Sequence, residues 1–555
     1  MELGDLGKYL IASSLFAGVS DNSPEELINW CQINNDKYTD HDFSTSILSL
    51  THLTTQSSKY KNWLKYTWRR ISEVSNDIEI FKDTLSPLDI IQGALGDCNF
   101  LCSLSILCEY PGLLQNIFIT KKQNSFGVYS VKLCIDGVWK IVNVDDFFPC
   151  GPNGMPVFSQ CVKGEIWVMI LEKVWAKRCG SYENTERSDL TSCLRDLTGA
   201  PTRVISAEVS AWDDLVNCKE SGYIVAASAG NTKSSHTLLE TVGLIGNISY
   251  AVLKTADVGE KIVQLRNPWS KVEWNGDWSD SSPKWTSRMK KKLNYEAADD
   301  GTFWMSFSDF CEYFSKISIC EYSPSSVYSS LQLSHDLNES IIIDLEIQKS
   351  GEYVLSINQK DKVFQDTLGT YNYSQVRLIV CREGRRGIEH SFGKRGNDRE
   401  VWSRVSLRRG SYKVLVLADW VCDEREAVIS AYGPQEVVFK SSITDLGVLE
   451  QLYMKKAEEV PPVDYGKSGF QGVYKYHEFL PEGFGYIYIK NSSESTILKE
   501  KTYFKVFKNL KLLPPFKDSS YEIVVNPGQG CFILIKVVGE GEYRLESSST
   551  YEKLN

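Results

Sequence analysis

The chain has 555 residues, which is too long for a single hydrophobic core, so about three to five domains are expected. Its net charge of −10, without any long basic run, argues against a general nucleic-acid-binding protein. The 15 cysteines lack the paired spacing of a disulfide framework or a zinc site, which predicts free thiols in a reducing compartment.

Residues 1–67 predict a mostly helical N-terminal extension without a chemical signal. The mildly apolar run 9–18 follows Glu2 and Asp5 rather than a basic region, so no signal peptide is expected. No apolar run approaches the length of a membrane span. These features favour a cytoplasmic location and leave membrane association open.

Residues 92–101 are the first segment that indicates chemistry. Cys98 precedes an apolar run with helical period that ends before Pro111. At a helix N-terminus the free backbone N–H groups and the positive dipole end favour a thiolate, and an amide such as Gln92 can donate to an oxyanion. The alternative is a buried structural cysteine that begins an ordinary core helix.

The middle of the chain mixes helix with strand patterns before it becomes rich in strands. A helix is predicted from about residue 165 to 177. Strands are predicted over 127–133, 138–144, 223–227, 237–244, 250–253 and 261–265.

Two polar residues in this region complete a candidate thiol-protease set. His236 is the only histidine between the Cys98 helix and residue 330, and it opens the strand predicted over 237–244. Asn267 ends the strand predicted over 261–265, where Pro268 terminates the ladder. Each alone is more commonly structural. Together with Gln92 and Cys98, they follow the order found in papain-like thiol proteases.

Several motifs then make the chain resemble the calpain family of papain-like cysteine proteases over residues 68–320. They are the nucleophile segment 92–98, Arg266-Asn267-Pro268-Trp269, the acidic and tryptophan-rich run 273–280, Phe303-Trp304-Met305-Ser306-Phe307, the helix motif over 166–177 and Trp68-Arg69-Arg70.

The resemblance implies an α+β papain-like two-lobe protease core, with one lobe over 68–200 and a second over 201–325. In the family, Cys98 is the nucleophile, His236 the general base and Asn267 its orienting partner. Gln92 shares the oxyanion hole with the Cys98 backbone N–H. Trp269 lies over Asn267 and forms a wedge between the lobes, and protein substrates are cleaved through a thioester acyl-enzyme.

The family also implies calcium, which closes the cleft between the lobes. The matching carboxylates are Asp89 and Glu165 in the first lobe and Glu273, Asp280 and Asp300 in the second. Thr302 stands where the family has a glutamate, and Pro87 where it has the arginine that pairs with that glutamate. We therefore expect calcium regulation with an altered or weakened second-lobe switch.

Three departures lie close to the expected chemistry. Asn99 replaces the tryptophan that follows the nucleophile, Ser235 replaces the glycine before the catalytic histidine, and Arg187 lies near an expected substrate-contacting glycine. They affect subsites beside the scissile bond and remove no catalytic atom. Asn99, Ser235 and the missing cleft pair at positions 302 and 87 leave open a second interpretation, a catalytically weak or inactive scaffold that acts through its C-terminal domains.

The C-terminal part predicts two all-β sandwich domains of calpain type, over 330–440 and 441–555. Short β-branched runs occur at 341–345, 353–357, 376–380, 412–417, 486–489, 523–525, 532–535 and 543–545. No EF-hand loop follows residue 325, so no small EF-hand subunit is expected as a partner. Phospholipid or protein binding by the sandwiches stays open, because eight cations give 380–410 a basic character: Arg382, Arg385, Arg386, Lys394, Arg395, Arg404, Arg408 and Arg409.

Overall fold

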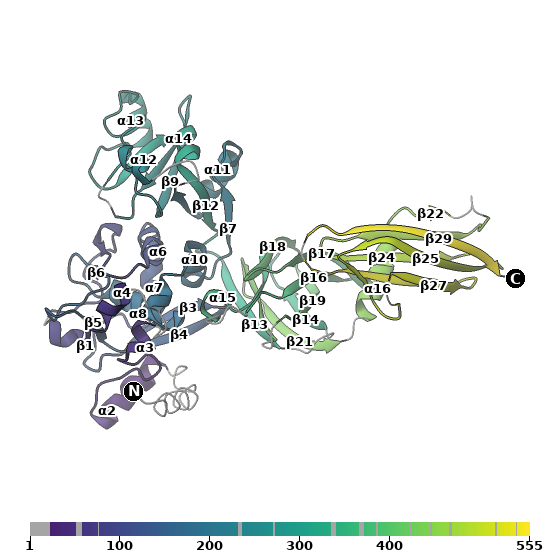
Figure 1. Cartoon of the computed structure of the whole chain (residues 1–555), viewed down its shortest axis with the longest axis horizontal. Coiled ribbons are helices and arrows are strands. Elements are labelled where there is room, and N and C mark those ends of the chain that lie inside the picture. The colour runs from purple at the N-terminus through teal and green to yellow at the C-terminus, as the bar shows by residue number, and fades with distance from the viewer. Residues whose placement is uncertain are drawn as a thin grey trace. The chain divides into compact units, whose positions relative to one another are not determined.

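The computed structural model describes residues 23–51, 58–75, 77–230, 236–269, 272–334, 340–365, 371–384, 387–421, 425–444, 447–464, 469–516, 519–539 and 541–554. The apolar run 9–18, Ser235, Arg385, Arg386 and the side chain of His236 lie outside the described part. The chain divides into two units, Met1–Pro324 and Ser325–Asn555 (Figure 1).

The first unit begins with an N-terminal half, residues 23–200, that is mainly helical. Its elements are α2 (Pro24–Asn34), α3 (Ile47–Leu50), α4 (Ser58–Trp63), β1 (Thr67–Arg70), α5 (Ile71–Val74), η1 (Pro87–Asp89), β2 (Ile90–Ile91), α6 (Cys98–Cys108), α7 (Leu113–Ile117), β3 (Tyr129–Ile135), β4 (Val138–Val144), β5 (Phe147–Cys150), β6 (Gln160–Cys161), α8 (Trp167–Cys179), α9 (Tyr182–Thr185) and α10 (Leu190–Thr198). The helix predicted over 165–177 and the two strands predicted over 127–144 are confirmed as α8, β3 and β4.

Helices α6 and α8 form the centre of this half. Nearly every residue of α8 is buried, as expected for a helix that is apolar on most of its circumference. Trp175 of α8 stacks on Phe100 of α6 with 5.0 Å between ring centroids and 10° between planes. The first turns of the Cys98 helix are therefore fixed by aromatic packing against α8.

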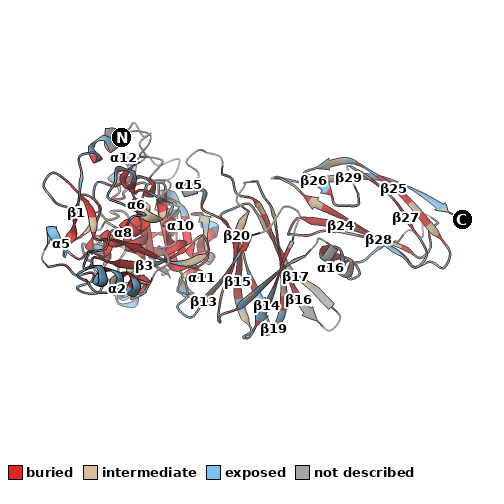
Figure 2. Ribbon diagram, turned by 90° about the horizontal axis from the view of Figure 1, so that it is seen from below, coloured by how far each residue is buried: buried red, intermediate tan, exposed pale blue. Residues whose placement is uncertain are grey.

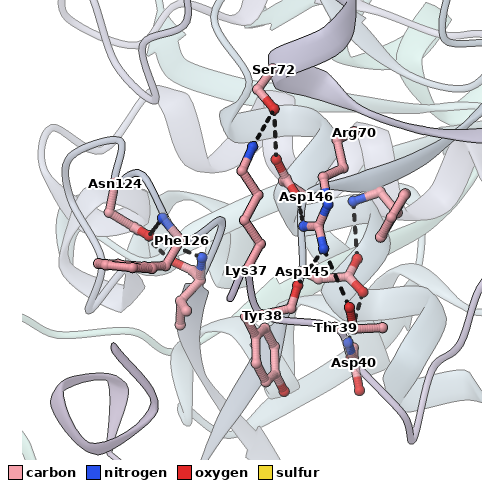
Figure 3. A network of polar contacts seen from close by, with 12 residues as sticks. Lys37, Tyr38, Thr39, Asp40, Arg70, Ser72, Asn124, Phe126, Asp145 and Asp146 are labelled. Carbon is pink, nitrogen blue, oxygen red and sulfur yellow. Dashed lines mark hydrogen bonds and ion pairs between the residues drawn. The ribbon is translucent and has the colours of Figure 1, made fainter. Parts of the chain in front are cut away.

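Buried ion pairs attach the surrounding segments to α8. Lys173 and Asp145 both have 0% side-chain exposure and form an ion pair, and Lys173 also donates to the Phe147 carbonyl at 2.6 Å. Lys177 donates to Asp40 at 2.8 Å. Arg70 pairs with Asp146 in the same network, which Figure 3 shows at close range. A single helix thus holds the 38–43 segment and the start of β5.

The C-terminal half of the first unit, residues 202–320, is built on a six-stranded antiparallel sheet of order β11-β10-β9-β8-β12-β7. Its elements are β7 (Thr202–Ser206), η2 (Val209–Ala211), α11 (Trp212–Glu220), β8 (Ile224–Ala229), α12 (His236–Thr241), β9 (Ser249–Asp257), β10 (Lys261–Arg266), α13 (Ser287–Leu293), β11 (Thr302–Ser306), α14 (Phe307–Tyr313) and β12 (Phe314–Cys320).

The strand predicted over 237–244 is wrong, because His236–Thr241 forms helix α12. Gly243 has φ 78°, and the Leu244 N–H donates to the Leu239 carbonyl at 2.8 Å, which is a glycine-dependent helix ending. A Cβ at Gly243 would lie 2.0 Å from the Glu273 carbonyl oxygen, so the position requires glycine. In the sequence, the feature that indicated a helix was Gly243 at its C-terminal end, whereas the apolar pattern suggested a strand.

The second unit contains two pairs of facing sheets. Sheets β13-β20-β15-β18 and β17-β16-β19-β14-β21 enclose one core, and sheets β22-β23-β24-β28-β26 and β27-β25-β29 enclose another. In Figure 2 buried and exposed residues alternate along several of these strands. Their bounds are β13 (Val327–Ser334), β14 (Ser340–Ile347), β15 (Gly351–Asn358), α15 (Lys362–Gln365), β16 (Gln375–Gly384), β17 (Gly387–Gly396), β18 (Glu400–Leu407), β19 (Gly410–Asp419), β20 (Glu426–Gly433), β21 (Val438–Thr444), α16 (Gly447–Ala457), β22 (Val463–Asp464), β23 (Val473–Phe479), β24 (Phe484–Asn491), β25 (Ile497–Lys508), β26 (Leu510–Leu512), β27 (Ser520–Val525), β28 (Gly530–Val537) and β29 (Arg544–Leu554).

A third apolar cluster and several buried charges join the two pairs of sheets. Helix α16 contributes Leu449, Leu452 and Tyr453 to this cluster between β16 and β24. Arg377 of β16 is 0% exposed, pairs with Asp419 at 2.7 Å and donates to the Val537 carbonyl at 2.8 Å. This buried arginine therefore connects β16 and β19 of one pair of sheets to β28 of the other with charge-assisted hydrogen bonds.

We expect Arg377→Ala to lower the free energy of unfolding by about 3 kcal/mol, because it removes a fully buried guanidinium with its hydrogen bonds to the partly exposed Asp419 and to the Val537 carbonyl. Urea denaturation followed by circular dichroism measures the change. Arg382→Ala on the same strand is the control, since Arg382 is exposed and should change stability little. Equal effects of the two substitutions would contradict a joining role for Arg377.

Candidate active site

Cys98 is the first residue of α6, as the sequence predicts. The Asp97 carbonyl begins the helix by accepting from the N–H groups of Phe100 at 2.9 Å and Leu101 at 3.2 Å. The Asp97 side chain makes no capping hydrogen bond, although aspartate is among the preferred N-cap residues. The Asp97 side chain therefore takes none of the N–H groups of the first turn.

The surroundings of Cys98 act on its thiol in opposite directions. Burial is the largest effect and raises the pKa of Cys98, and the nearby Asp97 carboxylate raises it further. Hydrogen bonds from the backbone N–H groups of Asn99 and Cys98 lower this pKa. The predicted stabilisation of a thiolate by the helix terminus is present but is outweighed by burial, so the thiolate needs a further cation.

Hydrogen bonds and a close backbone contact fix the conformation of the loop before Cys98. Gln92 donates through Nε2 to the Leu95 carbonyl at 2.9 Å, and the Gly96 N–H donates to Glu186 at 2.9 Å. A Cβ at Gly93 would lie 2.2 Å from the Phe158 carbonyl oxygen, which explains the glycine at this position. Gln92 thus lies on the same short loop as the nucleophile.

Asn99 is directed into the N-terminal half rather than left free beside Cys98. Its Nδ2 donates to the Ser188 carbonyl at 2.9 Å, and Trp175 donates to the Ser188 hydroxyl at 2.9 Å. The neighbouring Arg187 is exposed. Residue 99 therefore anchors the start of α6 to the 187–188 segment.

Asn267 follows β10 directly and is 0% exposed. Its Oδ1 accepts from the Trp269 N–H at 2.9 Å, and its Nδ2 donates to the Val272 carbonyl at 2.9 Å. The amide thus shapes the turn that carries the partly buried Trp269. The orientation of His236 by Asn267 stays a prediction, because the structure describes His236 only as the first residue of α12.

A contact that the sequence did not reveal joins the two halves of the first unit. Glu109, at the end of α6, forms an ion pair with Arg266, the residue before Asn267. Arg266 also donates to the Thr302 hydroxyl at 2.9 Å. A cavity of about 540 Å³ is lined by Glu109, Arg266 and other residues of α6, β9 and β10. The Thr302 hydroxyl therefore holds the arginine that makes the contact between the halves.

The acids predicted for the first-lobe calcium site already have other partners. Asp89 is 4% exposed and lies 3.4 Å from the Lys163 ammonium, which is also 3.8 Å from Asp83. Asp89 and Asp83 together raise the pKa of Lys163. Glu165 accepts from the backbone N–H groups of Lys82 and Asp83. A lysine thus supplies positive charge to this group of carboxylates.

The acids predicted for the second lobe lie within electrostatic reach of one another. Glu273 accepts from the Gly301 N–H at 2.7 Å, Asp280 from Ala298 at 3.1 Å and Asp300 from Thr302 at 2.9 Å. Burial raises the pKa of Glu273 and of Asp280, and the neighbouring carboxylates raise both further. Within the described ranges, however, no three His, Cys, Asp or Glu side chains converge closely enough to hold a metal ion.

Comparison with known proteins defines the class of this chain. The model of the calpain family cysteine protease matches residues 38–321, which is more than half of the chain. The chain belongs to the calpain family of cysteine proteases.

The relatives cover the same region. The calpain-type cysteine protease DEK1 of Zea mays is 38% identical over 283 residues, which are 47% of this chain and 13% of that protein. Human calpain-14 is 33% identical over 271 residues, or 46% of this chain and 39% of its own length. Mouse calpain-9 is 29% identical over 328 residues, or 56% and 46%. The chain therefore spans less than half the length of these relatives.

Two further findings concern the part of the chain that the structure describes. Every cysteine in the described ranges is a free thiol, in agreement with the scattered spacing. Among the helices that the structure describes, none has the length and apolarity to cross a membrane.

The raised pKa of Cys98 predicts how its alkylation depends on pH in the resting protein. Because burial favours the neutral thiol, the rate with iodoacetamide should keep increasing as pH rises beyond the ordinary cysteine pKa of about 8.5. Mass spectrometry of the Cys98 peptide measures this rate, with Cys98→Ala as the control. A rate that is already maximal at neutral pH would contradict it.

Proposed function

We propose that this protein is an intracellular cysteine endopeptidase that performs limited proteolysis of proteins with a papain-like two-lobe core. Supporting this, Cys98 begins a buried helix while Asn267 follows β10 directly and His236 begins α12. We take 68–200 and 201–325 as the two lobes of the core, after an extension over 1–67. The regions 330–440 and 441–555 are the two sandwich domains.

The proposed reaction proceeds in two steps. His236 takes the Cys98 proton, and the thiolate attacks the substrate carbonyl carbon to form a tetrahedral oxyanion, to which the Cys98 N–H and Gln92 donate. Collapse breaks the C–N bond, the imidazolium gives its proton to the leaving amine, and a thioester remains. Water, deprotonated by His236, then attacks the thioester and releases the acid and the thiol.

The raised pKa of Cys98 makes the position of His236 decisive in this proposal. Burial and Asp97 both oppose the thiolate, so an imidazolium beside the sulfur is the cation that offsets them. Asn267 orients that imidazole, and Trp269 lies at the wedge between the lobes. Asn99, Ser235 and Arg187 border the subsites in this proposal and affect substrate preference.

Calcium dependence belongs to the same proposal, with weakened sites. Asp89 and Glu165 would hold one Ca²⁺, and Glu273, Asp280 and Asp300 another, since calcium prefers carboxylate and carbonyl oxygens. In the described residues these carboxylates do not converge closely enough to coordinate an ion, so calcium binding requires their side chains to move. Lys163 competes at the first site, and Thr302 offers a hydroxyl in place of a carboxylate at the second.

A scaffold that acts through its sandwich domains, on phospholipid or protein partners, is the second candidate. Its support is the Asn267 amide, both of whose ends are engaged by its own turn. An irreversible epoxide probe for thiol proteases decides between the two functions. We expect a Cys98 adduct in calcium that is lost in Cys98→Ala and His236→Ala. No adduct in calcium or in chelator would favour the scaffold.

Calorimetric calcium titration tests the weakened sites. Lys163→Gln should strengthen binding at the first-lobe site by about twofold to fivefold, the range for a partly exposed ion pair, because it removes the competing ammonium. The exposed Lys121→Gln is the matched control. Equal affinities of Lys163→Gln and wild type would contradict competition by Lys163, and absence of any calcium heat would contradict calcium dependence.

A further inference from the structure

One peptide unit in the loop before Cys98 is held at both of its ends. The Leu95 carbonyl accepts from Nε2 of Gln92 at 2.9 Å, and the Gly96 N–H of the same peptide donates to Oε1 of Glu186 at 2.9 Å. In a trans peptide the carbonyl and the N–H point in opposite directions, so the two side chains lie on opposite sides of this unit. The Gln92 side chain is therefore connected to Glu186 through a single rigid peptide.

Glu186 is itself held by other segments of the N-terminal half. Its Oε2 accepts from the Tyr60 hydroxyl of α4 at 3.2 Å, and its backbone N–H donates to the Glu183 carbonyl at 3.2 Å. Burial and the Glu186 carboxylate raise the pKa of Tyr60 to about 12, so the phenol is neutral and is the donor in this contact. Tyr60 also packs edge-on against Trp63, with 4.9 Å between ring centroids. Each Glu186 oxygen thus has a donor from a different segment.

The surroundings of Gly96 bring the Glu186 carboxylate directly against the loop. A Cβ at residue 96 would lie 2.9 Å from the Glu186 carboxyl carbon and 3.0 Å from both of its oxygens. On the other side of Cys98, Asn99 donates to the Ser188 carbonyl at 2.9 Å. Residues 186–188 therefore contact the chain both before and after the nucleophile.

We propose that Glu186 is a positioning residue for the oxyanion hole: it holds the Leu95–Gly96 peptide, whose carbonyl anchors one N–H of the Gln92 amide and leaves the other N–H for the oxyanion. This role rests on the proposed peptidase function, in which Gln92 donates to the tetrahedral intermediate. An amide group has two N–H donors, so the anchor and the oxyanion do not compete for one hydrogen. Without Glu186, the peptide is free to rotate and the Gln92 side chain occupies other rotamers.

The effect of Glu186 on the thiol has the opposite sign to its effect on the oxyanion hole. Burial and Asp97 raise the pKa of Cys98 most, and the Glu186 carboxylate raises it further. Removal of Glu186 therefore favours the thiolate, although it should impair hydrolysis through the loss of an ordered Gln92. Reactions of Cys98 that form an oxyanion and reactions that form none should respond differently to the same substitution.

The first measurement is kcat and KM of the full chain in calcium with a fluorogenic peptide amide. Glu186→Ala should lower kcat by about tenfold with little change in KM, whereas loss of the donor itself in Gln92→Ala should cost about a hundredfold or more. Glu186→Gln should recover most of the rate, because its amide oxygen still accepts from the Gly96 N–H. Glu79→Ala, at an exposed glutamate of the same half, is the control and should keep the wild-type rate.

Two comparisons separate positioning of Gln92 from a general loss of structure. In the Gln92→Ala background, Glu186→Ala should cost less than about twofold, because both substitutions act through the same donor. Alkylation of Cys98 by iodoacetamide forms no oxyanion and should be at least as fast in Glu186→Ala as in wild type. A tenfold loss of kcat in the Gln92→Ala background, an equal loss in Glu186→Gln and Glu186→Ala, or an unchanged kcat in Glu186→Ala would overturn the proposal.

Hydrogen exchange of the Gly96 amide, measured by mass spectrometry, does not depend on activity. This amide should be protected in wild type and in Glu186→Gln and should exchange faster in Glu186→Ala. Fast exchange in wild type would overturn the proposal even if Glu186→Ala fails to fold. A wild type that hydrolyses no peptide and forms no epoxide adduct would instead contradict the peptidase function, and the exchange of Gly96 would then decide by itself whether Glu186 holds this peptide.

Discussion

The buried pair of Lys173 and Asp145 is the contact on which the N-terminal half of the first unit depends. Two fully buried charges are tolerated only as partners, and removal of either would leave the other uncompensated in the core. The pair fixes α8 against the start of β5. The neighbouring Glu172 is also buried and accepts from the Ser159 N–H, and residue 158 lies against Gly93, so the same helix supports both the framework and the segment that packs on the nucleophile loop.

Regular periodicity carried most of the fold prediction. The strands over 127–144 and the helix near 165–177 have unambiguous patterns and formed as predicted, as did the β-branched runs after residue 330. The run after His236 did not, because its apolar residues fit either strand or helix. Gly243 decided the matter through a backbone conformation and a close contact with Glu273 that no local pattern reveals.

The sequence predicted those features of the candidate site that depend on the local position of a single residue. The start of α6 at Cys98 followed from its position before an apolar run. The partners of Asp89 and Arg266 did not, because each contact joins segments far apart in the chain, such as Glu109 to Arg266. A family motif identifies candidate site residues, whereas burial and opposite charge determine which side chains contact one another in the fold.

The glycine ending of α12 has a mechanical consequence. The helix that begins with His236 ends against residues 273–275: a Cβ at Gly243 would collide with the Glu273 carbonyl, and the Asn275 N–H donates to Val242 at 3.1 Å. The Asn275 side chain adds a second hydrogen bond at 2.9 Å, to the Thr241 carbonyl. Because the end of this short helix is fixed to residues 273–275, a displacement of that segment would move the helix and with it the residue that begins the helix.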